Sequence, residues 1–198
     1  MTDVERKGNV VTAVFCEKEK FVADAFVLAT GSWSPETGRA FGLKIPVLPG
    51  KGYSMTLENP EKQLRLPAIL CEARVAMTPM GTRLRIGGTM EIDRLDREKL
   101  VDLKRVQGIL DGTMSFFPDL KLTLPPVEKI WHGLRPVSPD GLPYLGRAVG
   151  FENVFIGTGH AMSGLSLGPA TGFLLSNLMN GEAAAMDLNV FRTGRFGQ

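Results

Sequence analysis

The spacing of apolar residues predicts short strands along the first part of the chain. Residues 10–15 are rich in β-branched and aromatic side chains, and residues 17–20 form a polar turn. Residues 21–29 are almost all apolar, and the run stops at Thr30-Gly31. A continuous apolar run bounded by glycine is typical of a strand that is buried on both faces. We therefore expect a pair of strands between residues 10 and 29.

The middle of the chain predicts a sheet. Residues 45–57 contain a Pro-Gly turn that leads into a strand. Residues 75–79 and 83–89 flank Met80-Gly81-Thr82, which is the pattern of a hairpin. The adjacent Gly87-Gly88 inside the second of these strands predicts a bulge or a close backbone approach. Three more short strands are expected at residues 127–134, 142–145 and 154–156.

Two helices are predicted. Residues 96–117 have the clearest helical pattern, with Asp96 as the expected N-cap. The apolar positions of this helix are Leu100, Leu103, Val106, Leu110, Met114 and Phe117. A second helix is expected beyond Pro169, ending where Asn180-Gly181 supplies a C-terminal stop. The apolar stripe of the first helix is interpreted as a core contact.

Composition excludes several classes of function. The chain has 198 residues, 43% of them hydrophobic and 22% charged, with a formal net charge of +2. The sequence has no cluster of lysine and arginine residues that would indicate a nucleic-acid partner. No apolar run in it is long enough to span a bilayer. Two histidines and the distant Cys16 and Cys71 match no metal spacing, so we expect no metal site. The N-terminus lacks the apolar core of a signal peptide, so we expect a cytoplasmic location.

Candidate chemistry is concentrated between Trp131 and Thr171. Pro136 disfavours the helical region at Arg135, so this arginine is expected on extended backbone. Its planar guanidinium fits a carboxylate through two hydrogen bonds. The glycines that follow Ile156 allow close backbone approach, and the helix after them directs its positive end to the same place. The pattern predicts a carboxylate clamp beside a helix N-terminus that faces a cofactor.

The same residues resemble a known family. The segments GLRPVSPDGLPYLG and NVFIGTGHAMSGLSLGPATG are similar to the C-terminal signature of the FAD-dependent D-amino acid oxidase superfamily. The segments ADAFVLATGSWS, KGYS and RVAMTPMGTRLRIGGTMEI resemble the branch that contains bacterial D-amino acid dehydrogenase small subunits and glycine oxidases. The chain therefore looks like the C-terminal half of such an enzyme.

The resemblance implies an α+β fold. A mixed, largely antiparallel sheet with a packed helix would form the substrate-binding domain, at residues 45–150. Residues 1–44 and 151–198 would be C-terminal pieces of an FAD-binding, Rossmann-like domain. Self-association of this chain and peripheral contact with the inner face of the cell membrane stay open.

The resemblance also implies the roles of individual residues. Arg135 matches the arginine that binds the substrate carboxylate, and Tyr53 could reach the substrate, although a half-buried structural tyrosine is the simpler interpretation. The positions expected to contact the cofactor are Gly31, Gly159, His160, Ala161, Met162, Ser163, Gly164, Leu165 and Ser166. His160 is interpreted as a flavin contact, and no side chain is assigned as a catalytic base. Residues 134–144 contain no cysteine, so we expect non-covalent FAD.

The implied function is oxidation of a D-amino acid or a similar amino-carboxylate by hydride transfer to FAD. A glycine- or sarcosine-type oxidase, a 2-hydroxy-acid dehydrogenase of the same superfamily and a non-enzymatic binding module remain as alternatives. The chain lacks a complete dinucleotide fingerprint, because Gly157-Thr158-Gly159 has Met162 where the third glycine should be. We therefore expect these residues alone to be inactive.

Overall fold

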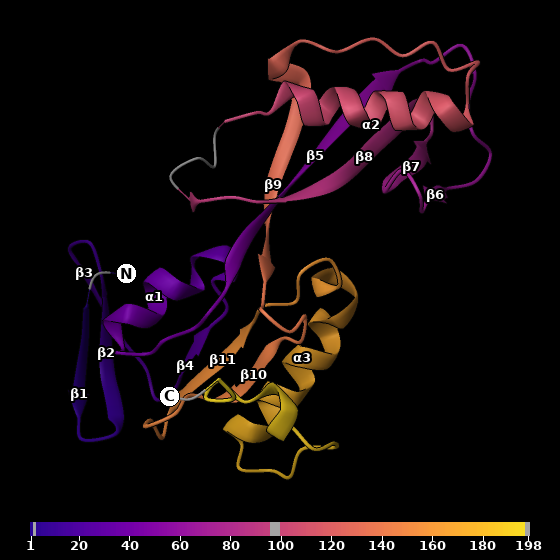
Figure 1. Ribbon diagram of the computed structural model, residues 1–198. Helices are drawn as coiled ribbons and strands as arrows, with labels where there is room; N and C mark the ends of the chain where they lie inside the picture. Colours follow the sequence, from indigo (N-terminus) through magenta and orange to yellow (C-terminus); the bar gives the residue numbers. More distant parts are fainter. Residues whose placement is uncertain (2, 96–99, 197–198) are drawn as a thin grey trace. The chain divides into compact units, whose positions relative to one another are not determined.

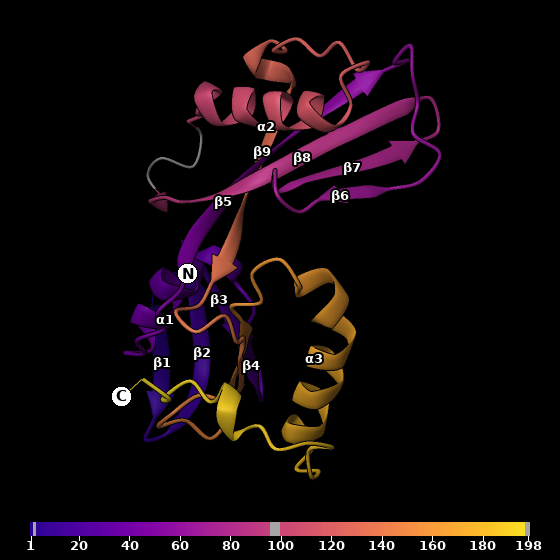
Figure 2. The same ribbon diagram turned by 45° about the vertical axis from the view of Figure 1, so that its right-hand side comes forward.

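The alternation of apolar residues in the middle of the chain builds one sheet covered by one helix. The computed structural model describes residues 1, 3–95 and 100–196, and the chain divides into two units, Met1–Pro49 with Arg135–Gln198, and Gly50–Leu134. In the second unit the strands lie in the order β6-β7-β8-β5-β9 (Figures 1 and 2). They are β5 (Leu48–Glu58), β6 (Ala68–Leu70), β7 (Val75–Met80), β8 (Arg83–Ile92) and β9 (Ile130–Val137). A short 3₁₀ turn, η3 (Val127–Lys129), precedes β9.

Helix α2 (Leu103–Phe116) lies across one face of this sheet (Figure 1). Val106, Ile109 and Leu110 are buried against alternate residues of the strands, among them Met77 and Ile86, which are fully buried. The intervening strand residues therefore point to the other face of the sheet. The predicted hairpin is confirmed, since β7 and β8 pair antiparallel from Val75 to Met80.

The predicted irregularity at the paired glycines is confirmed as well. The register between β5 and β8 shifts between Lys51 and Tyr53. A Cβ on Gly88 would lie 2.7 Å from the carbonyl oxygen of Arg74, and Thr89 has a φ of 59°. Glycine is required at position 88 because the neighbouring backbone occupies the space of a side chain.

The predicted start of the long helix was wrong. Asp96 lies outside the described residues, and α2 begins only at Leu103. Its N-cap is Asp102, whose side chain accepts from the backbone N–H groups of Lys104 and Arg105. Leu100 is 55% exposed, so the apolar stripe does not extend that far. The Asp102 carboxylate thus satisfies two N–H groups of the first turn, which have no partner within the helix.

The first unit contains two small sheets. One is an antiparallel meander in the order β1-β2-β3, and the other has the order β10-β11-β4. The strands are β1 (Asp3–Lys7), β2 (Val10–Cys16), β3 (Glu19–Val22), β4 (Phe26–Leu28), β10 (Tyr144–Arg147) and β11 (Val154–Thr158). The helical segments are η1 (Gly31–Trp33), α1 (Ser34–Ala40), α3 (Gly164–Met179) and η4 (Asn189–Phe191). Strand β11 is parallel to β4 and antiparallel to β10.

The single buried strand predicted at residues 21–29 was wrong. The run is divided between β3 and β4, and Val22 is 74% exposed. Asn153 fixes the break, because its side-chain amide donates to the carbonyls of Asp24 and Val11 and accepts from the Val11 N–H. Strand β10 belongs to this first unit through its pairing with β11, so the second unit is shorter than the predicted domain at 45–150.

Arg195 anchors the C-terminal segment to the end of β9 and the start of β10. Its Nε and Nη2 donate to the two carboxylate oxygens of Asp140 at 2.8 and 2.9 Å. The guanidinium lies 4.0 Å from the ring centroid of Tyr144 and also donates to the Leu142 carbonyl at 2.7 Å. The side chain of Arg195 is only 9% exposed. The hydrogen bonds from Arg195 lower the pKa of Asp140 to about 2.

We expect Arg195→Leu to lower the free energy of unfolding by about 2 kcal/mol, because it removes a largely buried guanidinium that donates hydrogen bonds to the Asp140 carboxylate and the Leu142 carbonyl. Folding stabilises the ionised form of Asp140. The contribution of this carboxylate to the free energy of unfolding is therefore fully present above its ordinary pKa of 3.8 and is lost as the pH falls toward 2. Urea denaturation between pH 2 and 5 should show this loss in the unaltered protein and not in the variant. Lys62→Leu is the control, because the Lys62–Asp119 pair is exposed and should contribute little. Equal losses in the two variants would contradict the assignment.

Candidate functional site

The carboxyl ends of β4 and β11 lie at the same edge of their sheet. The two strands are parallel, with Val154 opposite Phe26 and Ile156 opposite Leu28. Thr158 Oγ1 donates to the carbonyl of Gly31 at 3.2 Å and lies 2.8 Å from Ser34 Oγ. The chain segments that leave the two strands are therefore tied to each other. In parallel sheets ligands bind beyond this edge.

Two predicted glycines stand at these strand ends for different reasons. Gly31 has a φ of +56° and no atom within 4 Å of the position of a Cβ. Glycine is favoured there by backbone conformation, and the space beside it is open. Gly159 has a φ of +81°, and a Cβ there would lie 3.0 Å from the Tyr144 ring. Both conformation and packing favour glycine at position 159.

Helix α3 begins earlier than the sequence suggested. It starts at Gly164, with Pro169 inside it, so Gly164, Leu165 and Ser166 form its first turn. Ser163 is the N-cap residue but makes no side-chain capping bond. The first N–H groups of a helix have no partner within it and give it a positive end. The predicted contact segment is thus a short loop followed by a helix N-terminus.

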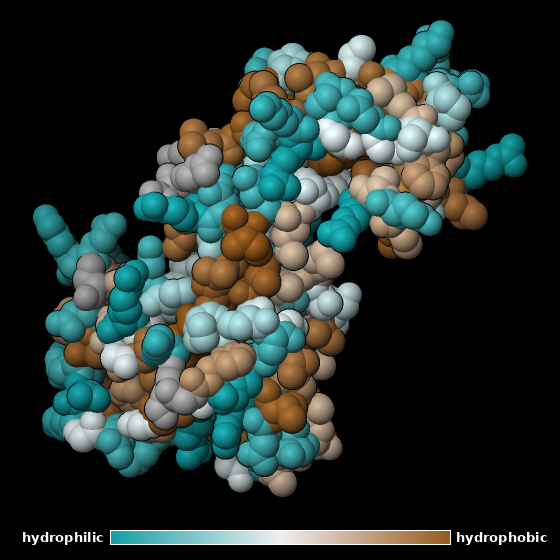
Figure 3. Space-filling view, in the orientation of Figure 1, coloured by the Kyte–Doolittle hydropathy of each residue, from teal (hydrophilic) through white to brown (hydrophobic). Residues whose placement is uncertain are grey.

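The side chains of this segment are unusually exposed for apolar residues. Leu165 is 95% exposed and Met162 is 74% exposed. Phe173, farther along α3, is 60% exposed. Figure 3 shows apolar side chains at the surface over α3. This end of the first unit presents apolar surface next to the free N–H groups of a helix.

His160 is held within the first unit by α3. Its Nε2 lies 2.9 Å from Thr171 Oγ1, on the third turn of the helix. Burial lowers the pKa of His160 below its ordinary value of 6.5. The imidazole is therefore neutral at pH 7. Its contact fixes the orientation of the ring and connects the loop to the helix.

The strand that bears Arg135 is bonded to the same loop. The Ala161 N–H donates to the Pro136 carbonyl at 2.9 Å, and Val137 forms a β-bridge with His160. Arg135, the neighbour of Pro136, lies on the extended backbone of β9 as predicted. Burial lowers its pKa, but a guanidinium stays charged at all ordinary pH values. The structure thus brings the backbone of Arg135 next to the loop 159–163.

Tyr53 is not half-buried, as the sequence suggested, but fully buried, with 2% exposed. It belongs to the second unit, whereas Arg135 and the loop belong to the first. Its hydroxyl donates to Glu91 Oε2 at 3.0 Å and accepts from the Asp102 N–H at 3.2 Å. Burial, above all, raises the pKa of Tyr53 to about 12. Both hydrogen-bonding roles of the hydroxyl are used within the protein.

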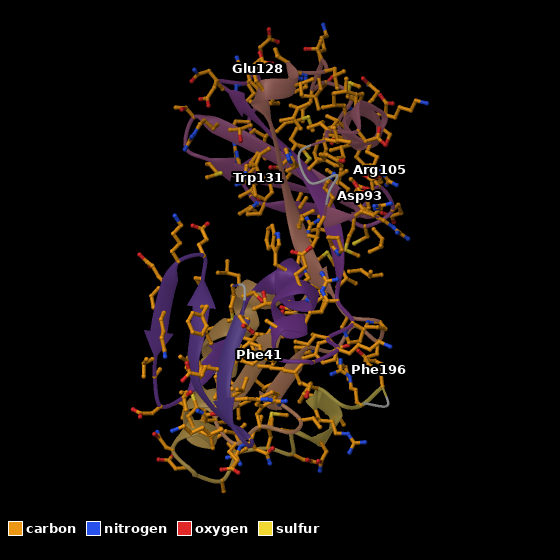
Figure 4. The ribbon with its side chains drawn as sticks, turned by 90° about the vertical axis from the view of Figure 1, so that its left-hand side faces the viewer. Phe41, Asp93, Arg105, Glu128, Trp131 and Phe196 are labelled. Atoms are coloured by element: carbon orange, nitrogen blue, oxygen red, sulfur yellow. The ribbon has the colours of Figure 1, made fainter. Side chains whose placement is uncertain are left out.

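Around Tyr53 lies a buried polar network that the sequence did not reveal. Lys51 is 1% exposed and donates to Asp93 Oδ2 at 2.8 Å and to the Leu100 carbonyl at 3.0 Å. Arg105 Nε lies 3.2 Å from Glu91 Oε2. Asp93 and Arg105 lie on the same side of the second unit (Figure 4). The network joins β5 and β8 to the start of α2, and the Tyr53 hydroxyl takes part in these structural contacts.

Three buried hydroxyls in the first unit lack hydrogen-bond partners among the described residues. They are Ser32 Oγ, next to Gly31, Ser138 Oγ, next to Val137, and Thr193 Oγ1 in the C-terminal segment. Ser32 and Ser138 directly follow segments of the candidate site. With the open space at Gly31 and the N–H groups of α3, they fit a planar ligand with polar edges, such as a flavin ring. The described residues offer no such set of groups for a diphosphate, because the dinucleotide fingerprint after β11 is incomplete.

In the ranges 1, 3–95 and 100–196, no group of three or more His, Cys, Asp or Glu could hold a metal ion. Within the same ranges, none of the helices has the length and hydropathy needed to cross a bilayer.

Comparisons with known proteins show the family of the chain. The family model described as FAD dependent oxidoreductase (DAO) matches residues 1–178. A D-amino acid dehydrogenase of Allorhizobium ampelinum is 32% identical over 197 residues, which are 96% of this chain and 45% of that protein. A glycine oxidase of Pseudomonas aeruginosa is 32% identical over 92% of this chain and 49% of its own length.

A solved structure shows the same fold. The glycine oxidase of Geobacillus kaustophilus superposes with a TM-score of 0.83 and 29% identity, over 98% of this chain and 51% of that protein. The chain spans about half the length of the relatives that it matches.

Proposed function

Because the chain belongs to the DAO family of FAD-dependent oxidoreductases, we propose that it forms the substrate-binding and flavin-facing part of an enzyme that oxidises a D-amino acid or a similar amino-carboxylate. The observation that supports this most is the backbone contact between the strand of Arg135 and the loop before α3. It supports the proposal because Arg135, which would bind the carboxylate, and the N-terminus of α3, which would face the cofactor, belong to one unit.

Arg135 and the loop would position the substrate and the cofactor. FAD, when bound, would supply the redox chemistry by accepting a hydride from the substrate α-carbon. Arg135 would bind the substrate carboxylate and orient the molecule. The N–H groups at the start of α3 and the Gly31 backbone would face the cofactor. Neutral His160 would keep the loop in shape through Thr171 and would remove no proton from the substrate.

A chimeric enzyme tests this function. In the Allorhizobium ampelinum D-amino acid dehydrogenase, the matched 45% of the protein would be replaced by this chain. We expect the chimeric enzyme to purify with FAD and to reduce a dye with D-amino acids. A folded, flavin-loaded chimera that oxidises no amino acid would contradict the proposal.

Product analysis of the same chimera distinguishes the related activities. A D-amino acid or glycine substrate releases ammonia, sarcosine releases methylamine, and a 2-hydroxy acid releases neither. All of these substrates present a carboxylate to one arginine, so Arg135 alone does not separate them. We propose a D-amino acid as the first choice.

Gly164→Val should reduce the flavin content of the chimeric enzyme or alter its visible spectrum. A Cβ at Gly164 would meet only the His160 Cβ, at 3.4 Å, so the chain itself accepts a side chain there. The new isopropyl group would then point toward whatever lies beside the first turn of α3. The measurement is the ratio of flavin to protein absorbance.

Gly157→Val is the matched comparison for this effect. A Cβ at Gly157 would lie 2.9 Å from Leu175 Cδ1 and 3.2 Å from Thr171 Cγ2, so the expected effect is a lower melting temperature. If Gly164→Val also lowers the melting temperature and leaves the flavin spectrum unchanged, position 164 serves helix packing instead.

A further inference from the structure

Three hydroxyl groups form a continuous hydrogen-bonded chain at the carboxyl ends of β4 and β11. Thr30 Oγ1 donates to Ser34 Oγ at 3.3 Å, and Ser34 Oγ lies 2.8 Å from Thr158 Oγ1. Thr158 Oγ1 donates in turn to the Gly31 carbonyl at 3.2 Å. All of these residues belong to the first unit. The hydroxyl chain therefore connects the segment after β4 with the last residue of β11.

The direction of the hydroxyl chain follows from the number of protons available. A hydroxyl group has one proton to donate and two lone pairs that accept. Because Thr158 gives its proton to the Gly31 carbonyl, it accepts from Ser34 at the 2.8 Å contact. Ser34 has then used its own proton, and it accepts the proton of Thr30. Donation thus runs from Thr30 through Ser34 and Thr158 to the Gly31 carbonyl.

The inner members of the hydroxyl chain are withdrawn from solvent, whereas its first member is not. Ser34 is fully buried, Thr158 is 2% exposed, and Thr30 is exposed. The Gly31 carbonyl also accepts from the Ser34 N–H, so both of its lone pairs are used. Hydrogen bonds that run in one direction through a buried place polarise and strengthen one another. The Thr30 hydroxyl is therefore held with its proton turned inward.

The Thr30 hydroxyl consequently presents an acceptor, and no donor, to a ligand beside it. Among the described residues, none donates a hydrogen bond to Thr30 Oγ1, so its lone pairs stay available. The neighbouring Gly31 has open space where a Cβ would lie. Ser32 Oγ, on a residue that is 1% exposed, lacks a partner in the described part of the chain. A ligand that carries its own O–H groups would match the Thr30 acceptor.

We propose that Thr30 accepts a hydrogen bond from a hydroxyl group of the ribityl chain of a flavin, and that Ser34 and Thr158 are positioning residues that keep Thr30 an acceptor. The proposal rests on the proposed function, under which the flavin ring lies beside Gly31. The ribityl chain is the polyhydroxylated group attached directly to that ring, so it is the part that a side chain next to Gly31 would meet. The ring N–H and the ribose of the adenosine are the other donors of FAD.

The first experiment measures the binding of three flavins to the chimeric protein after its own flavin has been removed. FAD carries the ring, the ribityl chain and the adenosine ribose, riboflavin lacks the ribose, and lumiflavin also lacks the ribityl hydroxyls. Thr30→Val keeps the shape of the side chain and removes its hydroxyl. The variant should bind FAD and riboflavin about fivefold more weakly and lumiflavin normally, as measured by flavin fluorescence. Thr30→Ser, which keeps the hydroxyl, should bind all three as the unaltered protein does.

The second experiment tests the positioning role of the buried hydroxyls. Thr158→Val removes the acceptor of Ser34 at nearly the same volume, so Thr30 is no longer held in one orientation, and riboflavin should bind about threefold more weakly. In the Thr30→Val background the same substitution should not change the riboflavin Kd further, because it acts through Thr30. Thr37→Val is the control, since the Thr37 hydroxyl donates to the Trp33 carbonyl and takes no part in the hydroxyl chain.

The ribityl assignment is overturned if Thr30→Val binds riboflavin normally, if it weakens lumiflavin as much as riboflavin, or if it weakens FAD alone. The positioning role is overturned if Thr158→Val weakens riboflavin equally with and without Thr30. If Thr158→Val does not fold, Ser34→Ala takes its place in the same comparison.

None of these binding constants depends on turnover. A chimera that binds riboflavin through Thr30 and oxidises no amino acid would contradict the proposed function alone. A chimera that oxidises D-amino acids and binds riboflavin equally well with valine at position 30 would contradict the role of Thr30 alone. If the chimera binds no flavin, the proposed function fails, and the same titrations of the chain by itself decide the role of Thr30, with no riboflavin binding or no effect of Thr30→Val overturning it.

Discussion

Arg135→Met in the chimeric enzyme should raise the KM for D-amino acids at least about thirtyfold. Methionine keeps the length and the apolar stem of the side chain but removes the guanidinium. Loss of one partner from a desolvated, hydrogen-bonded charge pair costs about 2–5 kcal/mol, and each 1.4 kcal/mol is a factor of about ten. Arg135 is only partly exposed, and this burial lowers the pKa of its guanidinium. Steady-state kinetics with two D-amino acids would measure the effect.

Flavin content should be unchanged in this variant. The contact between β9 and the loop is made by backbone atoms, the Ala161 N–H and the Pro136 carbonyl, which the substitution leaves in place. Arg147→Met is the control, because Arg147 is an exposed arginine on β10 of the same unit. A normal KM together with a lower melting temperature would show that Arg135 is a structural arginine and that the clamp assignment is wrong.

Local patterns predicted the elements whose determinants are local. The hairpin of β7 and β8 follows from alternation around Met80-Gly81-Thr82, and its paired glycines indicated the irregular register. Strand β11 follows from an apolar run that ends in glycine. In each case the residues that decide the structure lie within a few positions of one another.

A long-range contact explains one error, and local features of the helix starts explain the others. The break between β3 and β4 depends on Asn153, which is 129 residues away from Asp24. The C-terminal segment is likewise held by a distant partner, because Arg195 binds the carboxylate of Asp140, 55 residues earlier. The start of α3 was placed too late because proline favours the first turn of a helix. Here Pro169 lies inside α3, where it leaves the Leu165 carbonyl without a helical donor.

The sequence predicted only some of the residues of the candidate site. The family resemblance supplied Arg135 and the residues from Gly159 to Ser166, and the structure shows that they share one unit. The contact of Thr158 with Ser34 and Gly31 depends on the parallel pairing of β4 and β11, which no local pattern indicates. The surroundings of Tyr53 depend on which face of the sheet α2 covers, and the sequence alone did not settle this.

The 198-residue chain alone should bind FAD with a Kd of about 1 mM or weaker and should not oxidise D-amino acids. The diphosphate of FAD requires a glycine-rich turn between a strand and a helix, and the segment after β11 has Met162 in place of the last glycine. A ligand without its phosphate anchor keeps only part of its contact energy but still loses its translational freedom. The exposed apolar residues Leu165, Phe173 and Val27 should in addition promote self-association of the chain.

Titration of the purified chain with FAD and with riboflavin, followed by flavin fluorescence, measures this prediction. The two ligands share the ring system, so they should bind about equally weakly if the chain contacts the ring alone. Sedimentation at two protein concentrations would detect self-association, and a dye-reduction assay with mixed D-amino acids would detect turnover. If FAD binds more than about tenfold more tightly than riboflavin, a site for its diphosphate or adenosine exists within these residues. Tight stoichiometric binding, or turnover by the chain alone, would show that the whole cofactor site is already present.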